Sequence, residues 1–288
     1  MPSATNDAKV WFITGCSTGF GKQIAEAALK RGDVVVATAR KLVSLNELKE
    51  KGAVIRELDV TWSDEQLSDI VSDVLSIVGR IDILVNNAGY ILTGGVEEVS
   101  REEALHQYTT NVFGQLNVSR AILPHMRSRR SGVICNMASI GSYRGVAGAG
   151  LYCASKAACS LHSEALRAEV AHLGIEVVAV EPGYFRTNFL TSSNRKRAGK
   201  RIEDIMEPVE TAVKTLDGKN LKQPGNPVKG AELLVEALTK SGRCEGRSLP
   251  ARLALGSDAV KLIPEIMDKI RGDIDDWKEL TQNTSFDE

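Results

Sequence analysis

Short apolar segments alternate with amphipathic, helix-like segments along the first two thirds of this chain. The apolar segments are rich in Val and Ile, which favours buried strands, and they span residues 10–13, 33–38, 54–58, 81–85, 133–135 and 175–180. After the first segment, Ile24, Ala27 and Ala28 share one helix face, and Gly32 is placed to end that helix. Ser63 and Gly79 are typical start and stop residues of a further helix. This alternation predicts an α/β fold in which a doubly wound parallel sheet of about seven strands has helices on both faces.

The alternation breaks at residues 188–228. Residues 195–201 form a basic run, and the segment after it is interrupted by Pro208, Gly218, Pro224, Gly225 and Pro227. We predict a partly helical lid over a substrate site, mobile until ligands bind. The basic run is typical of a solvated surface, and binding of an anionic substrate or carrier is the alternative. We expect a C-terminal helical extension at about 257–280 and a single domain over residues 1–288.

A glycine-rich turn follows the first apolar segment. It reads Thr14-Gly15-Cys16-Ser17-Thr18-Gly19-Phe20-Gly21 and leads directly into the first helix. Glycines allow a tight turn and a close approach of the backbone to a ligand, while the N–H groups at a helix start attract phosphate. The order strand, turn and helix therefore predicts a site for the pyrophosphate of a dinucleotide.

The second strand ends in Thr38-Ala39-Arg40, close to the position where dinucleotide-binding folds place a carboxylate against the adenosine ribose. A carboxylate repels a 2′-phosphate, whereas a guanidinium group binds it with charge-assisted hydrogen bonds. Arg40 therefore predicts NADP rather than NAD as the cofactor. The alternative is a solvated surface arginine next to Lys41.

Tyr152 and Lys156 are spaced four residues apart, which places both side chains on one helix face. A neighbouring ammonium group favours a phenolate, so we expect Lys156 to lower the pKa of Tyr152 from its ordinary value of about 10. A tyrosine with such a pKa serves as a general acid or base.

Together with five further segments, these motifs resemble the short-chain dehydrogenase/reductase family. The additional segments are Leu58-Asp59-Val60, Asn86-Asn87-Ala88-Gly89, Thr110-Asn111-Val112-Phe113-Gly114, Asn136-Met137-Ala138-Ser139 and Pro182-Gly183-Tyr184-Phe185-Arg186-Thr187. They occur in the family's order and cover residues from about 9 to 190. The Gly-Cys-Ser-Thr-Gly-Phe-Gly motif, with Phe20 between the last two glycines, resembles the corresponding motif of NADP-dependent fungal ketoreductases and of steroid- and retinol-type dehydrogenases.

The resemblance implies a Rossmann fold and an NADP(H)-dependent oxidoreductase that reduces a ketone or aldehyde of a hydrophobic small molecule to an alcohol. The implied catalytic residues are Asn111, Ser139, Tyr152 and Lys156. The implied cofactor-binding residues are Gly15, Ser17, Thr18, Gly19, Phe20, Gly21, Arg40, Asp59, Val60, Asn87, Ala88, Gly89, Tyr152, Lys156, Pro182, Gly183, Phe185 and Thr187. Tyr143, Tyr184, Phe185, Phe189 and Met206 indicate a hydrophobic substrate pocket.

Three other functions use the same residues or the same fold. An alcohol dehydrogenase working in the oxidative direction has the same catalytic group. An epimerase or cyclase returns the hydride to the molecule that gave it. A non-catalytic NADP sensor is the third alternative, and the intact set of four catalytic residues disfavours it.

Composition limits the possible partners. Lys and Arg number 36 against 37 Asp and Glu, so a net charge of −1 gives no support for nucleic-acid binding. Five scattered cysteines show no zinc-binding spacing, and we expect no metal site and reduced thiols in a cytoplasmic enzyme without a membrane span. By resemblance, the helices expected at 101–123 and 152–173 form the face of a homodimer or homotetramer.

Overall fold

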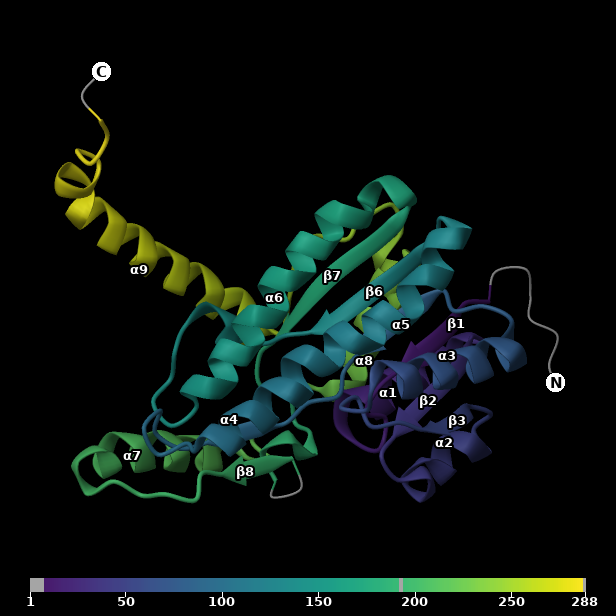
Figure 1. Cartoon of the computed structure of the whole chain (residues 1–288), viewed down its shortest axis with the longest axis horizontal. Coiled ribbons are helices and arrows are strands. Elements are labelled where there is room, and N and C mark those ends of the chain that lie inside the picture. The colour runs from purple at the N-terminus through teal and green to yellow at the C-terminus, as the bar shows by residue number, and fades with distance from the viewer. Residues whose placement is uncertain (1–7, 192–193, 287–288) are drawn as a thin grey trace.

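The computed structural model describes residues 8–191 and 194–286 and is built on a seven-stranded parallel sheet (Figure 1). The strand order is β3-β2-β1-β4-β6-β7-β9, and each neighbouring pair is parallel. The strands are β1 (Val10–Ile13), β2 (Val34–Ala39), β3 (Val54–Glu57), β4 (Ile83–Asn86), β6 (Gly132–Met137), β7 (Ile175–Pro182) and β9 (Arg252–Leu255). The predicted doubly wound sheet is thus confirmed, and it brings the carboxyl ends of seven strands to one edge.

Helices cover both faces of the sheet. The core on one face joins β1 and β2 to side chains of α1 (Gly19–Arg31), the short α2 (Asn46–Glu50) and α8 (Pro227–Thr239). The core on the other face joins the strands to α3 (Asp64–Val78), α5 (Gly114–Arg129) and α6 (Gly150–Val170), which lie in front of the sheet in Figure 1. Side chains such as Trp11 and Phe12 alternate between the two cores because successive residues of a strand point to opposite faces.

Helix ends follow the signals in the sequence. Ser63 caps α3 by accepting a hydrogen bond from the Gln66 amide, and Gly79 ends the helix with a φ of 76°. Gly32 ends α1 in the same left-handed conformation, with a φ of 92°. Such a φ favours glycine because other residues place a Cβ against the backbone.

The helix expected at 101–123 is longer and interrupted. It consists of α4 (Arg101–Tyr108), a π-helical turn η2 (Thr109–Phe113) and α5, which continues through Pro124 to Arg129. The helix expected at 152–173 is α6, which begins two residues earlier, at Gly150, and ends at Val170. A π-helical turn leaves no mark in the apolar periodicity, so the sequence pattern could not show it.

The segment 188–228 is more ordered than its prolines and glycines indicate. Residues Arg195–Arg197 form β8, which pairs in parallel with β5 (Ile91–Thr93) as a separate two-stranded sheet. Helix α7 (Glu203–Lys219) includes both Pro208 and Gly218 and buries Val209, Val213 and Leu216. Spacings of four and three residues place these apolar side chains on one helix face, and their burial outweighs the local cost of the proline.

The C-terminal helix α9 spans Ser257–Thr281, the region where a helical extension was expected. Its first turns pack on the end of the sheet, and the rest projects away from the body of the protein (Figure 1). Within the described residues, no helix combines the length and the apolar character that a bilayer crossing requires.

Candidate active site

The glycine-rich turn connects β1 to α1 and has no room for a side chain at Gly15 or Gly21. Gly15 has a φ of 71°, and a Cβ there would lie 3.0 Å from the Ala88 Cα. A Cβ on Gly21 would lie 2.5 Å from the Gly15 carbonyl oxygen, which is closer than real Cβ atoms approach. The turn therefore requires glycine at both positions, and it leaves the N-terminus of α1 facing the edge of the sheet where ligands bind.

Asn87 holds this turn from the neighbouring strand end. Its side-chain amide donates to the carbonyl oxygens of Thr14 at 2.9 Å and Gly15 at 3.0 Å. In return, the Thr14 hydroxyl accepts from the main-chain amides of Asn87 and Ala88 at 3.0 and 3.1 Å. The segment after β4 thus fixes the shape of the turn through hydrogen bonds between side chains and main-chain groups.

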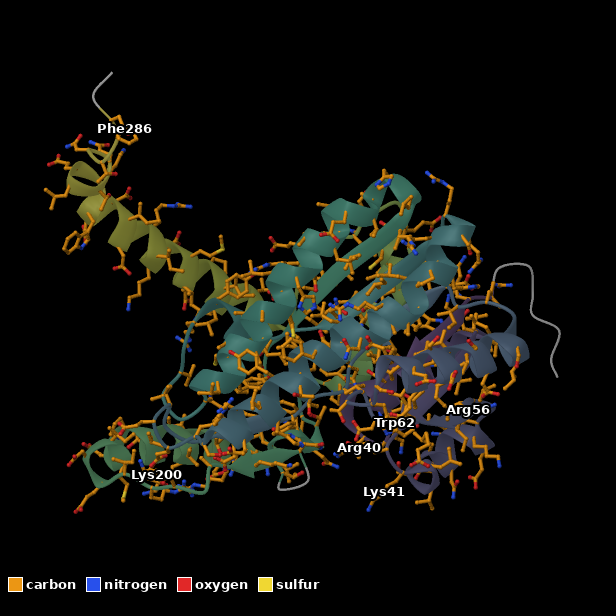
Figure 2. The ribbon with its side chains drawn as sticks, viewed as in Figure 1. Arg40, Lys41, Arg56, Trp62, Lys200 and Phe286 are labelled. Carbon is orange, nitrogen blue, oxygen red and sulfur yellow. The ribbon has the colours of Figure 1, made fainter. Side chains whose placement is uncertain are left out.

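The ends of β2 and β3 carry Arg40 and Asp59. Arg40 is exposed at the end of β2, next to Lys41 (Figure 2), and both Arg40 and Asp59 line the same cavity as the glycine-rich turn. The Asp59 carboxylate accepts hydrogen bonds from the Thr61 amide and hydroxyl at 2.9 and 2.8 Å. No carboxylate of the described residues forms an ion pair with Arg40, so its guanidinium is available to an anion.

Helix α6 carries Tyr152 and Lys156 on its buried face. Their exposed fractions are 9% and 4%, and the Lys156 ammonium lies 6.0 Å from the centre of the Tyr152 ring. The ammonium donates to the Met137 carbonyl oxygen at 2.6 Å, which ties α6 to the end of β6. Two residues beyond this carbonyl, Ser139 caps the turn η3 (Ile140–Tyr143) and its hydroxyl accepts from the Gly141 amide at 3.0 Å.

The expected depression of the Tyr152 pKa is wrong. Burial raises the pKa of the Tyr152 phenol, and a hydrogen bond with Ser139 offsets only part of this effect. Burial also lowers the pKa of the Lys156 ammonium. The cost of a buried phenolate outweighs the attraction of an ammonium group that is itself buried. The phenol therefore keeps its proton at neutral pH, which is the state that a general acid needs.

Asn111 lies in the π-helical turn η2 and is fully buried. Its side-chain amide donates to the Tyr90 carbonyl oxygen at 3.0 Å and to the Ser155 hydroxyl at 3.1 Å, and its side-chain oxygen accepts from the Tyr90 amide. Its main-chain carbonyl oxygen accepts from the Cys159 thiol. Asn111 thus joins the turn after β4 to the middle of α6 and supports the residues on either side of it.

The segment 182–187 is held by aromatic packing. Phe185 lies edge-on to Phe20 with ring centres 4.7 Å apart, and it contacts three glycines closely enough that a Cβ on Gly225 would lie 2.6 Å from its ring. The Tyr184 amide donates to the Asp258 carboxylate at 2.7 Å. Phe20 therefore packs between the glycine-rich turn and this segment.

All predicted catalytic and cofactor-binding residues except two line one cavity of about 320 Å³. The exceptions, Gly21 and Asn111, lie directly behind it and shape its walls. The end of the cavity around Tyr152 is apolar, with Tyr152 packed among Ile91, Cys153 and Leu216. We call it the substrate end, and the end at the glycine-rich turn the cofactor end. Burial raises the pKa of the Cys153 thiol, although Arg144 acts in the opposite direction.

Two of the residues expected in the substrate pocket lie elsewhere. Tyr143 faces away from the cavity and donates to the buried Glu181 carboxylate at 2.6 Å, which also accepts from Ser160 at 2.7 Å. Burial raises the pKa of Glu181, and Arg252 at 3.6 Å acts against this. Met206 is 40% exposed on α7 and does not line the cavity. Aromatic and apolar side chains look alike in sequence, so only tertiary packing separates wall residues from core and surface residues.

The basic run 195–201 is not simply solvated. Arg195 pairs with Asp217 at 2.5 Å, and Arg197 and Arg201 pair with Glu210, so these arginines attach β8 to α7. Lys196 differs, because it lines the cavity and its ammonium lies 5.3 Å from the centre of the Tyr90 ring. No signal in the sequence separates Lys196 from its neighbours.

Comparison with known proteins agrees with this site. The short chain dehydrogenase family model matches residues 9–198, and the chain belongs to that family. It is 34% identical over 281 residues to Oxidoreductase BOA17 of Botryotinia fuckeliana, which covers 95% of this chain and 98% of that protein.

Two solved structures share the fold. A short-chain dehydrogenase from Streptomyces avermitilis is 38% identical, with a TM-score of 0.88 over 98% of this chain and 100% of that one. An actinorhodin polyketide ketoreductase solved with NADPH is 31% identical, with a TM-score of 0.73 over 90% of this chain and 100% of that one.

Proposed function

We propose that this oxidoreductase uses NADPH to reduce a ketone or aldehyde on a hydrophobic small molecule, with Tyr152 as the general acid. The observation that carries the proposal is the shared cavity, in which a protonated, buried Tyr152 lies at the apolar end and the glycine-rich turn at the other. A protonated phenol favours reduction, because reduction consumes a proton at the substrate oxygen.

The residues present fit a nicotinamide dinucleotide. Gly15 and Gly19 have φ values of 71° and 62° and present bare backbone at the start of α1, where a pyrophosphate is stabilised. Arg40 would hold the 2′-phosphate of NADP. The presence of NADPH in the actinorhodin ketoreductase structure supports the same choice. When bound, the cofactor supplies the hydride.

The chain's own groups place and protonate the substrate. The Ser139 hydroxyl would donate a hydrogen bond to the substrate oxygen as negative charge develops there, and Tyr152 would transfer its proton to that oxygen. Lys156, held by the Met137 carbonyl, would bind the cofactor ribose and provide positive charge near Tyr152 as the phenol loses its proton. Asn111 would hold α6 and the turn after β4 in a fixed position relative to each other.

The thiols and the exposed apolar residues support a cytoplasmic location and a homo-oligomer. All five cysteines are free, which supports a reducing compartment such as the cytoplasm. Leu105, Phe113 and Leu161 are 55%, 48% and 60% exposed on α4, η2 and α6, which supports a subunit face along these helices.

The test is Tyr152→Phe, which removes the acidic hydroxyl and retains the ring. NADPH oxidation should be followed with a panel of hydrophobic ketones, alongside NADPH affinity measured by fluorescence. We expect turnover to fall by about 10² to 10⁴ with the cofactor affinity unchanged, because general acid catalysis contributes about that factor. Turnover within a few-fold of the unaltered protein would remove Tyr152 from this role.

A further inference from the structure

Two cations stand at the substrate end of the cavity, and they come from separate parts of the chain. Lys196 extends from β8 and Arg144 from the segment between η3 and α6, and both line the cavity. Neither forms an ion pair or hydrogen bond with a side chain of the described residues. The three arginines of the basic run all pair with carboxylates of α7. Lys196 differs from them because its side chain lines the cavity instead.

The position of Lys196 is fixed by its neighbours. Its carbonyl oxygen accepts from the Thr93 hydroxyl at 3.1 Å, and its ammonium lies over the Tyr90 ring. The Tyr90 hydroxyl and His106 Nδ1 are 2.9 Å apart, so the ring is held as well. These contacts keep the ammonium at the mouth of the cavity.

The charges around the cavity are unevenly distributed. Asp59 is the one carboxylate that lines it among the described residues, and it lies at the cofactor end. The substrate end combines an apolar wall, which includes Ile91, Phe189 and Leu216, with the two cations. Such a site is complementary to a molecule with an apolar body and a negative end.

We propose that the substrate is an amphipathic anion, in which a reducible carbonyl on an apolar body enters the cavity and a carboxylate or phosphate at the far end binds Lys196 and Arg144. The inference rests on the proposed function for the carbonyl. Its anion-binding part can be measured without turnover.

Binding is tested with decanoate, decyl phosphate and methyl decanoate, which share an apolar chain and differ in the end group. We expect both anions to bind about tenfold more tightly than the ester, which corresponds to about 1.4 kcal/mol, and the preference to shrink at high salt. Tighter binding of decanoate would assign the carboxylate, and tighter binding of decyl phosphate the phosphate. Equal affinity for the anions and the ester would overturn the inference whatever the enzyme's activity.

Substitutions locate the effect. Lys196→Gln and Arg144→Gln should each remove most of the preference for the anions and leave methyl decanoate binding unchanged. The matched control is Lys200→Gln, because Lys200 belongs to the same basic run but does not line the cavity (Figure 2). If Lys200→Gln lowers the preference as much as Lys196→Gln, general surface charge is responsible and the inference is wrong.

Turnover then separates this inference from the proposed function. With 9-oxodecanoate and its methyl ester, we expect KM to be about tenfold lower for the acid and kcat to be similar. Reduction of both at equal KM would refute the anion site alone. Anion-selective binding with no reduction of any carbonyl would refute the proposed function alone.

A different observation concerns the projecting part of α9. Every residue from Met267 to Phe286 is exposed, including Met267 at 51%, Ile270 at 47%, Ile274 at 61% and Trp277 at 63%. The same side chains recur at alternating spacings of three and four residues. They occupy the a and d positions of two heptads, and Phe286 marks the far end of the projection in Figure 2. Val260 and Ile263 continue the same spacing, but Ile263 is buried against the end of the sheet.

Met267, Ile270, Ile274 and Trp277 form an apolar stripe, and the charges beside it determine which partner it can bind. Arg271 and Lys278 occupy e positions and Asp273 occupies a g position, so a second α9 running parallel would place Asp273 of one copy next to Lys278 of the other. An antiparallel second copy would bring the basic e positions together. Helix α9 carries seven acidic and four basic residues, a net charge of −3, which disfavours an anionic lipid surface.

We infer that this stripe binds the same stripe of a second copy of the chain in a parallel two-stranded coiled coil. In that arrangement, an a position of one helix faces the same a position of the other. Ile274→Cys should therefore form a disulfide between two copies under mild oxidation. The control Asp275→Cys places the thiol one residue away, on the outer face. Both are scored as covalent dimer on a non-reducing gel, at dilutions that suppress random encounter.

Four of the five natural cysteines are buried, and the unaltered protein sets the background from Cys244. Cross-linking of Ile274→Cys but not of Asp275→Cys is the expected result. Equal cross-linking of the two variants, or none from Ile274→Cys, would overturn the parallel arrangement. Lys278→Asp should weaken association, and Asp273→Lys combined with Lys278→Asp should restore it. Stronger association from Lys278→Asp alone would indicate antiparallel helices and contradict the inference.

Discussion

The two ends of the cavity are built differently. At the cofactor end, consecutive residues of a few short turns provide the walls, and hydrogen bonds to main-chain groups, such as those from the Asn87 side chain, hold them. At the substrate end, the walls come from β5, α6, β8 and α7, and side chains hold them. The cofactor end therefore depends on the presence of small residues, whereas the substrate end depends on which large residues meet there.

Besides the loss expected from Tyr152→Phe, the largest effect is expected where the two ends meet. Ser139→Ala removes the hydroxyl that we expect to donate to the substrate oxygen, and turnover should fall by about 10² to 10³, the usual cost of losing one such donor. Because the hydroxyl also accepts from Gly141, the melting temperature should be measured alongside turnover. Unchanged turnover in a stable variant would place Ser139 in the cofactor wall rather than in the chemistry.

At the cofactor end, Arg40→Ala should weaken NADPH binding by about 1.5–3 kcal/mol, the range for a hydrogen bond to a charged group, and leave NADH binding nearly unchanged. Calorimetric titration with both cofactors measures the difference. Lys41→Ala is the matched control one residue away. Equal losses for NADPH and NADH, or a natural preference for NADH, would show that Arg40 does not bind a 2′-phosphate.

Adding one methyl group should change stability differently in the glycine-rich turn and in α7. Gly21→Ala forces a Cβ against the Gly15 carbonyl and should cost about 1–3 kcal/mol in the free energy of unfolding. Gly218→Ala, in α7, meets no atom within 4 Å and should increase stability by about 0.5–1 kcal/mol. Chemical denaturation of both variants checks the contrast. Similar losses in both would mean that α7 is packed as tightly as the glycine-rich turn.

The smallest expected effect concerns mobility. We predict that amides of β8 and α7 exchange faster than those of α3 in the free protein and slow down when NADP and substrate bind, as a lid requires. Hydrogen exchange followed by mass spectrometry resolves these segments. Buried Val209 and Val213 favour a well-seated α7, so protection that does not change on binding would make the segment a fixed wall instead.

The same contrast explains what the sequence could predict. Six of the seven main strands and the glycine-rich turn between β1 and α1 were recognisable because local patterns determine them, as Ser63 and Gly79 determine the ends of α3. The seventh strand, β9, was not located because its four residues, Arg252–Leu255, include no β-branched residue, unlike the equally short β1, β3 and β4. The three-residue strands β5 and β8 are too short to show periodicity. The proline in α7 was misleading, since its cost is local and the burial that offsets it is tertiary. The pKa of Tyr152 was also wrong, because burial depends on the whole fold.

Cys153 has a consequence for chemical durability. If the cavity binds carbonyl compounds, as we propose, a thiol beside Tyr152 in its wall would meet electrophiles such as conjugated enones, which alkylate thiolates. Burial raises the pKa of Cys153 and keeps it in the unreactive thiol form at neutral pH. We therefore expect Cys153 to resist alkylation, and prolonged incubation with an enone should leave it unmodified.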